Sequence, residues 1–507
     1  MSSNFQNKSP EGSERLLLVT LSVGLLFCVP LFLVAWPPML DYPQHLAMAT
    51  ILAKFTDPVY GFSEFYIRHF TKPNALFEYL VAGGMSLVSA NLAGKITLAV
   101  ALVATGVSAS ALARRSSGEA WMGLAALAVF YSHLFYWGFV GTLMAIPYFF
   151  AALVYADRNL DSVERPFVRL VLFFWTLSFY VVHAQFALLY AGSVVWLHLS
   201  NGSGIRQYKA LLPSVVGGAG LSTAFTMHTT ATPGVFEQSI SAAPVFKPLG
   251  ERLALISELV FGAHAEYSNA VVAFIALLLV ILAYSGAQSS GDQQSGPMYR
   301  FRFASLSGWI WLMYCVLPLN FGQYLIQERL APLAASLLLV SLPAFVGGRR
   351  RIAQGLLAAM LFVQWAGVST GALIFDAESA GIEEVLEDTE PGKKLMGLVV
   401  QRKSLTLRHP DVYLHFPAIY QVTRGGQVNF SFAELIHSAV SPREGKSFDP
   451  ILAEVQPRNL SGFSMDRHGS VFDYLLVRGT KEDVQKLIGT SQRRLQIRSK
   501  GRWHLLW

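Results

Sequence analysis

The chain has 507 residues, of which 53% are hydrophobic and only 14% are charged. Soluble globular domains carry about 25% charged residues. This composition therefore excludes an ordinary soluble enzyme or a disordered chain and indicates a protein that is largely embedded in lipid. The net charge of +7 does not indicate nucleic-acid binding, because the positive residues fall in short clusters between apolar runs. Cys28 and Cys315 lie inside apolar segments, so we expect no disulfide.

The first apolar run covers residues 16–36 and is long enough to span a bilayer, which takes about 20 residues. Trp36, Pro37 and Pro38 follow it in place of a small-residue cleavage signature. We therefore expect an uncleaved span and not a signal peptide.

Clusters of positive residues punctuate the rest of the membrane region. No charged residue lies between Glu119 and Asp157 or between Arg169 and Arg206. Each interval is too long for one span of about 30 Å, but it fits two spans joined by a tight turn, near residues 136–141 and 183–185. All the clusters then share the face of the N-terminus, which the positive-inside rule makes cytoplasmic. The clusters are Arg114–Arg115, Arg158–Arg165–Arg169, Arg206–Lys209, Arg300–Arg302 and Arg349–Arg350–Arg351.

These intervals predict a polytopic α-helical membrane protein with about eleven transmembrane helices. An odd number of spans puts the tail outside the cytosol. The predicted division is a transmembrane module at residues 1–373, with a long first outer loop at about 37–93, and an extracytoplasmic domain at 374–507. The predicted spans are about 16–36, 94–113, 119–135, 139–156, 167–183, 186–200, 210–227, 268–285, 304–320, 330–347 and 354–373.

The tail is polar and is large enough to form one soluble α/β domain with its own core. Strand-like patterns occur at 395–400, 411–416 and 472–477, and helix-like patterns at 380–386 and 481–488. Tyr413-Leu414-His415-Phe416 is interpreted as a strand and Arg424-Gly425-Gly426 as a turn, so we favour structural roles over acceptor binding for both.

The first outer loop is the most informative segment. It begins Trp36-Pro37-Pro38-Met39-Leu40-Asp41-Tyr42-Pro43-Gln44-His45, and an amphipathic stretch that reaches Lys54 predicts a helix lying at the membrane surface. The loop then reaches Phe70-Thr71-Lys72-Pro73. A carboxylate at the mouth of a membrane span is a functional candidate, because charge at membrane depth is costly.

A first span, an Asp close to its outer end, a surface helix and a Lys-Pro before the second span together resemble the GT-C superfamily of membrane glycosyltransferases. Within it, the pattern is most similar to the lipid A aminoarabinose transferase and protein O-mannosyltransferase group, and many GT-C enzymes also carry a soluble outer domain. Two positions differ. Tyr42 stands where those enzymes have a second carboxylate, and Thr71 stands where they have a Glu before the Lys-Pro.

The resemblance implies an inverting glycosyltransferase whose donor is a sugar on a polyprenyl phosphate, presented at the outer leaflet. Asp41 is the candidate catalytic base. Lys72 and Arg329 are the candidates for meeting the negative charge that develops on the phosphate. Arg252 is a third and weaker candidate, and His45 is a further substrate-binding candidate. The acceptor would be a lipid, a glycan or a protein.

Each candidate also has a structural alternative. Asp41 is suited to cap the following helix, Lys72 to reach lipid headgroups, and Arg329 to pair with Glu328. His45 and His69 could join Asp41 as metal ligands, but their spacing matches no metal signature and we expect no cofactor. His183, at a predicted hairpin turn, is interpreted as structural.

Two other functions remain open from the sequence. One is a transporter or flippase of a lipid-linked or polar substrate, although such a path should place ionisable residues near the bilayer midplane. The other is a scaffold or sensor that displays the tail. For the preferred glycosyltransferase, the expected location is the bacterial inner membrane, as part of the cell-envelope machinery, with a cytoplasmic N-terminus and a periplasmic C-terminal domain.

Overall fold

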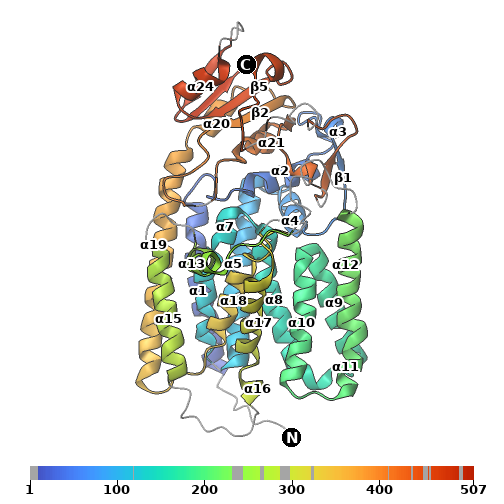
Figure 1. The fold of residues 1–507 in the computed structure, drawn as a ribbon, viewed down its shortest axis with the longest axis vertical. Coiled ribbons are helices and arrows are strands. Elements are labelled where there is room, and N and C mark those ends of the chain that lie inside the picture. The colour runs from blue at the N-terminus through green and yellow to red at the C-terminus, as the bar shows by residue number, and fades with distance from the viewer. Residues whose placement is uncertain are drawn as a thin grey trace.

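The structure is a bundle of long helices with a small α/β domain at one end (Figure 1). It is a computed structural model, and it describes residues 10–117, 119–230, 244–262, 268–285, 297–320, 325–408, 410–435, 438–448, 455, 458–489 and 495–507. Helix α1 begins at the end of the bundle opposite the α/β domain, and α19 runs in the same direction along the bundle and leads into that domain.

The bundle helices are α1 (Pro10–Phe32), α5 (Ala90–Ser116), α6 (Ala125–Phe130), α7 (His133–Trp137), α8 (Val140–Arg158), α9 (Pro166–His183), α10 (Gln185–Ser200), α11 (Ile205–Leu211), α12 (Gly217–Thr230), α13 (Leu249–Ala254), α14 (Ile256–Phe261), α15 (Ser268–Ser285), α16 (Pro297–Arg300), α17 (Arg302–Val316), α18 (Leu330–Val340) and α19 (Gly348–Ser379). The two predicted hairpin turns are confirmed, because α7 ends at Trp137 before α8, and α9 ends at His183 before α10.

Six helices in the described part of the chain are long and apolar enough to cross a membrane, against about eleven predicted spans. The other five predicted spans coincide with shorter or interrupted helices. The 119–135 segment is divided into a 3₁₀ helix (Ala120–Leu124), α6 and α7, and α18 has only 11 residues. A protein-facing segment can be shorter than a lipid-facing span, because neighbouring helices cover its ends. The full count of spans therefore stays a prediction.

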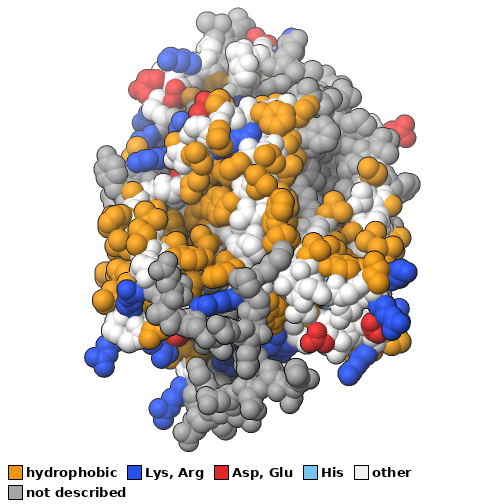
Figure 2. All heavy atoms as spheres, turned by 60° about the horizontal axis from the view of Figure 1, so that its bottom comes forward, with side chains coloured by type: hydrophobic (Ala, Val, Ile, Leu, Met, Phe, Trp, Pro, Cys, Tyr) orange, Lys and Arg blue, Asp and Glu red, His pale blue; other side chains and the backbone are white. Residues whose placement is uncertain are grey.

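The outside of the bundle is apolar, as lipid requires. Phe167, Phe274 and Phe362 are 72%, 60% and 66% exposed, which would be costly in water. Figure 2 shows this hydrophobic band with Lys and Arg side chains around the rim at the end opposite the α/β domain. With six apolar helices and this surface, the chain is an integral membrane protein.

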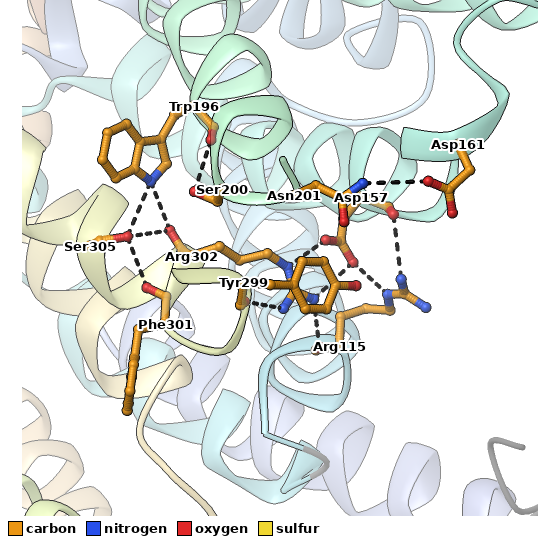
Figure 3. Close-up of polar contacts among 10 residues, drawn as sticks. All are labelled: Arg115, Asp157, Asp161, Trp196, Ser200, Asn201, Tyr299, Phe301, Arg302 and Ser305. Carbon is orange, nitrogen blue, oxygen red and sulfur yellow. Dashed lines mark hydrogen bonds and ion pairs between the residues drawn. The ribbon is translucent and has the colours of Figure 1, made fainter. Parts of the chain in front are cut away.

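A buried ionic cluster joins three helices at that same end of the bundle (Figure 3). Asp157 of α8 is fully buried; its two carboxylate oxygens lie 2.6 Å from Nε of Arg302 in α17 and 2.7 Å from Nε of Arg115 in α5. Arg302 also donates to the carbonyls of Arg115 and Tyr299. One carboxylate between two guanidinium groups thus fixes the relative positions of α5, α8 and α17.

The α/β domain contains a five-stranded mixed sheet in the order β3-β2-β5-β7-β6, with β2 parallel to both β3 and β5 and the other pairs antiparallel. Two of the three predicted strands are confirmed, and so are both predicted helices. The segment 411–416 is instead a turn that enters a 3₁₀ helix (Phe416–Ala418). The elements are α20 (Ile382–Leu386), β2 (Lys394–Val399), α21 (Ile419–Arg424), β3 (Gln427–Val428), β4 (Val440–Pro442), α23 (Met465–His468), β5 (Tyr474–Arg478), α24 (Lys481–Ile488), β6 (Ile497–Lys500) and β7 (Trp503–Leu506).

The two faces of this sheet have different partners. Leu475 and Val477 of β5 pack into a core within the domain, whereas Tyr474 and Leu476 join the core that continues into the helix bundle. Side chains alternate between the faces of a strand, so a single strand contributes to both cores. The domain therefore has the predicted core of its own, and its other face joins the core that it shares with the first outer loop and the helix bundle.

The first outer loop is enclosed by this junction and forms α2 (Tyr42–Ala53), α3 (Phe62–Phe65), β1 (Tyr66–Arg68) and α4 (Leu76–Gly84). Strand β1 pairs with β4 of the C-terminal domain, with Tyr66 opposite Pro442. Gln421 donates to the hydroxyl of Tyr66 at 2.7 Å, and Gly426 N donates to the carbonyl of Tyr60 at 2.8 Å. The loop and the C-terminal domain therefore form one layer over the bundle (Figure 1).

The ionic cluster predicts a large stability effect. Asp157→Asn should lower the free energy of unfolding by about 3–5 kcal/mol. The substitution removes the negative charge that the guanidinium groups of Arg115 and Arg302 share in Figure 3. Thermal unfolding of the purified protein in detergent measures this. Asp161→Asn is the control, since Asp161 is exposed and bonds only weakly to Asn201, at 3.4 Å. Equal melting temperatures for the two variants would contradict the structural role of Asp157.

Candidate active site

The backbone at the start of α2 is bonded to the end of α7. Leu40 N donates to the carbonyl of Tyr136 at 2.9 Å, and Asp41 N donates to that of Trp137 at 3.0 Å. Gly138 makes this approach possible, because its φ is +81° and a Cβ there would lie 2.7 Å from Asp41 N. Asp41 is therefore held at a defined position against the helix bundle.

Helix α2 is buried, which corrects the prediction of a helix at the membrane surface. Nearly every residue from Tyr42 to Leu52 is inaccessible, and Figure 1 shows α2 between the bundle and the C-terminal domain. The apolar positions in the sequence predict a helix with one apolar face, but Ala47, Met48 and Ala49 make the other faces apolar as well. A helix that is apolar on all sides belongs in a protein interior.

The side chain of Asp41 does not cap α2, so the capping alternative is wrong. Its Oδ1 instead lies 2.9 Å from Nδ1 of His415 in the C-terminal domain, and both side chains are almost fully buried. His415 stacks on Phe430, with ring centroids 4.9 Å apart, and meets the edge of Phe432. The buried carboxylate of Asp41 thus lies beside the imidazole of His415 and makes no capping hydrogen bond to the backbone of α2.

His45 forms a second pair between a histidine and a carboxylate close by. Its Nδ1 lies 2.6 Å from Oε1 of Glu78, which extends from α4. Burial by itself lowers the pKa of His45, but the carboxylates of Glu78 and Asp41 outweigh this and leave the pKa raised, with Arg329 opposing them. His45 therefore carries positive charge over a wider pH range than a solvated histidine.

Arg329 brings a cation to the same cluster. It precedes α18, is half-buried, and its guanidinium lies 4.1 Å from the ring centroid of Phe139 and 3.2 Å from Nε2 of His183. Burial lowers the pKa of Arg329 to about 10, and the Asp41 carboxylate acts against this shift. His183, for which the sequence predicts a structural role, thus contacts Arg329, a candidate for binding the donor phosphate.

Lys72 lies on the loop between β1 and α4, beside the same end of α9. Tyr180 donates to the carbonyl of Thr71 at 2.7 Å, and Asn74 Oδ1 accepts from Ala184 N at 2.8 Å. Lys72 is half-buried. Burial is the main cause that lowers the pKa of His69, and the positive charge of Lys72 lowers it further.

The metal alternative finds no support in the described residues, where no three His, Cys, Asp or Glu side chains are grouped to hold an ion. His69, which was considered as a ligand with Asp41 and His45, instead places Nε2 2.8 Å from the hydroxyl of Ser441, beside the β1–β4 pair.

Arg252 has a structural contact set and lies outside the cluster around Asp41. Its NH1 donates to three carbonyls at the end of α17, and its Nε donates to the carbonyl of Lys247. This guanidinium satisfies backbone groups that the end of α17 leaves without helical partners. Glu328 is bound by Lys247, with Nζ and Oε1 2.7 Å apart.

An apolar groove of about 850 Å³ runs along α4, α5 and α8. Near the C-terminal domain it is lined by Leu76 and Val182, close in sequence to Glu78 and His183, and it extends along the bundle to Arg158 at the far end of α8. Hydrocarbon side chains form most of its wall, so it suits a long apolar chain.

Comparison with solved structures identifies this fold. The chain matches ArnT from Cupriavidus metallidurans bound to undecaprenyl phosphate with a TM-score of 0.57 and 12% identity, over 98% of each chain. It matches the apo state of the same protein with a TM-score of 0.59 and 11% identity, also over 98% of each chain. The predicted polytopic helical fold with a C-terminal domain is therefore confirmed as the fold of ArnT, over nearly the full length of both chains. No family model and no curated protein sequence matches this chain.

The His45–Glu78 pair predicts a pH-dependent effect on stability. Because the pKa of His45 is raised above its usual 6.5, the stabilisation is fully present below that pH and is lost as the pH rises through the raised value. Glu78→Gln should therefore lower the melting temperature more at pH 6 than at pH 9. Asp57→Asn, at a half-buried pair with Lys54, is the control. A Glu78→Gln deficit that is equal at both pH values would contradict a charged pair.

Proposed function

We propose that the chain is an inverting glycosyltransferase that moves a sugar from a polyprenyl-phosphate donor to an acceptor at the outer face of the membrane. The observation that carries the proposal is a cluster of buried charged groups under the C-terminal domain. Asp41 lies 2.9 Å from His415, and His45, one turn further along α2, lies 2.6 Å from Glu78. The charge of Arg329, which contacts His183 at 3.2 Å, acts on this cluster. The fold supports it, because the matched ArnT structure was solved with undecaprenyl phosphate bound.

Asp41 has the chemistry of the general base. The acceptor oxygen attacks the anomeric carbon and breaks its bond to the donor phosphate, while the acceptor's proton passes to the carboxylate of Asp41. A carboxylate that was capping its helix would be tied to backbone N–H groups, whereas that of Asp41 makes no such bond. The second carboxylate of the family's motif is replaced by Tyr42, which is buried and bonds to Asn91, so the base function rests on Asp41 alone.

Arg329 and protonated His45 are the proposed partners of the leaving phosphate, with Lys72 as a third. A phosphate gains negative charge as the glycosidic bond breaks, and fixed cations at that position lower the barrier. Arg329 offers a planar fork that matches two phosphate oxygens. Its ring contact with Phe139 and its contact with His183 hold that fork in place. Arg252 is left out, because backbone carbonyls use its guanidinium.

The apolar groove is the proposed site of the polyprenyl chain. Its wall is almost entirely hydrocarbon, which favours an isoprenoid tail over the polar cargo of a transporter. The exposed arginines at the end opposite the C-terminal domain, such as Arg165 and Arg349, favour a cytoplasmic location for that end. Transfer would then occur on the extracytoplasmic, periplasmic side.

The base assignment predicts that Asp41→Asn lowers the transfer rate by about 10²–10⁴-fold, because the amide keeps the shape but cannot accept the proton. The assay supplies a panel of undecaprenyl-phosphate pentoses and hexoses to membranes containing the chain and measures undecaprenyl phosphate release. Asp57→Asn, a half-buried carboxylate in the same loop, should release it at the wild-type rate. Full activity in Asp41→Asn would refute the base assignment.

The phosphate assignment predicts that Arg329→Gln weakens binding of undecaprenyl phosphate by about tenfold or more, the usual effect of losing one charge-assisted hydrogen bond. Arg329→Lys should bind with intermediate affinity. Native mass spectrometry of the purified protein measures both. Arg158→Gln is the matched control, because Arg158 lines the other end of the groove. If Arg158→Gln weakens binding and Arg329→Gln does not, the lipid lies in the reverse orientation and the assignment is wrong.

A further inference from the structure

The nearest ionisable partner that the structure records for the Asp41 carboxylate comes from the C-terminal domain. Nδ1 of His415 and Oδ1 of Asp41 are 2.9 Å apart, and the two side chains are 9% and 12% exposed. Among the described residues Nδ1 of His415 makes no hydrogen bond of good geometry, so the contact with Asp41 is a close approach of the two groups. After a small rotation of the ring, either the neutral imidazole with its proton on Nδ1 or the imidazolium presents a donor to the carboxylate. The contact joins segments at opposite ends of the sequence, and no motif of the first outer loop contains it.

We propose that His415 is a positioning residue for Asp41, so that the C-terminal domain completes the active site. The inference rests on the proposed function and adds a residue to it. A donor on Oδ1 fixes the rotation of the carboxylate, and the second oxygen is then the one that takes the acceptor's proton. Because Tyr42 follows Asp41, no adjacent carboxylate is present to orient the side chain of Asp41. His415 takes that role.

The surroundings of His415 hold its ring in one orientation. The ring stacks on Phe430 at an interplanar angle of 27°, and Phe432 lies edge-on between the rings of His415 and His45. Gln44 of α2 holds the Phe430–Phe432 segment with two hydrogen bonds to its backbone. Its Nε2 donates to the carbonyl of Phe430 at 2.9 Å, and its Oε1 accepts from Phe432 N at 3.0 Å.

Gln44 therefore connects the two parts of the site. It lies three residues after Asp41 on the same buried helix and bonds to the residues that support His415. The spacing between base and imidazole is consequently set by hydrogen bonds across the domain junction. Such supporting contacts orient a reacting group and typically change rates by about 10- to 100-fold when they are lost.

Two substitutions of His415 separate a positioning role from simple packing. His415→Phe keeps an aromatic ring on Phe430 but removes the donor, whereas His415→Asn removes the ring and places an amide N–H near the Nδ1 position. If His415 positions Asp41, the Phe variant should lose about 10- to 100-fold in kcat with KM changed less than about twofold. The Asn variant should recover most of this loss.

The experiment measures kcat and KM for undecaprenyl phosphate release with the donor panel described above. Folding of each variant is checked by size-exclusion chromatography and by undecaprenyl phosphate binding, which should be unchanged. His504→Asn is the matched control: His504 is equally buried in the same domain but contacts Ser499 and Gly479. Its kcat should equal that of the wild type.

The outcomes are distinct for the two proposals. Wild-type kcat in folded His415→Phe, or a folded His415→Asn that is as impaired as or more impaired than His415→Phe, would mean that the ring only packs, and would overturn the positioning role alone. Absence of release by the wild-type protein from every donor would overturn the proposed function, and the role of His415 with it.

Discussion

The structure depends on the burial of one short helix. Helix α2 is apolar on nearly every side, so it is stable only where the bundle covers one face and the C-terminal domain the other. Its first turn is bonded to the carbonyls of Tyr136 and Trp137 through a close approach that only Gly138 permits. The same burial brings Asp41, which precedes the helix, out of water and next to His415 of the C-terminal domain, and the charge of Arg329 from the segment before α18 acts on it.

Burial also explains why the ionisable groups of this region occur in pairs. A charge at low dielectric costs several kcal/mol unless a partner compensates it, and Asp41 with His415, Glu78 with His45, and Glu328 with Lys247 each provide one. The Asp157 cluster applies the same rule at the opposite end of the bundle. That cluster satisfies its carboxylate with two arginines inside the protein, whereas the Asp41 cluster lies next to the groove and contains groups suited to proton transfer and phosphate binding.

The C-terminal domain is part of the same folded unit as the membrane helices. Its sheet has a core of its own on one face, but the other face, strand β4 and the segment around Phe430 are all bonded to the first outer loop. A domain that was only displayed by the membrane part would not need this continuous contact.

The sequence by itself determined the features that depend on local composition. Long apolar runs and Arg clusters predicted the membrane bundle, and the length of the two charge-free intervals predicted its hairpins. The pattern of the first outer loop, with Asp41 after the first span, indicated the fold. Only the tertiary structure decided which groups meet. His415 lies in a segment whose pattern resembles a strand, and Glu78 carries no motif. Arg252 was a weaker candidate than Arg329 from the sequence, and only the structure showed that backbone carbonyls bind its guanidinium. Contacts between distant segments are set by packing across the domain junction, and a pattern read along the chain contains no information about that packing.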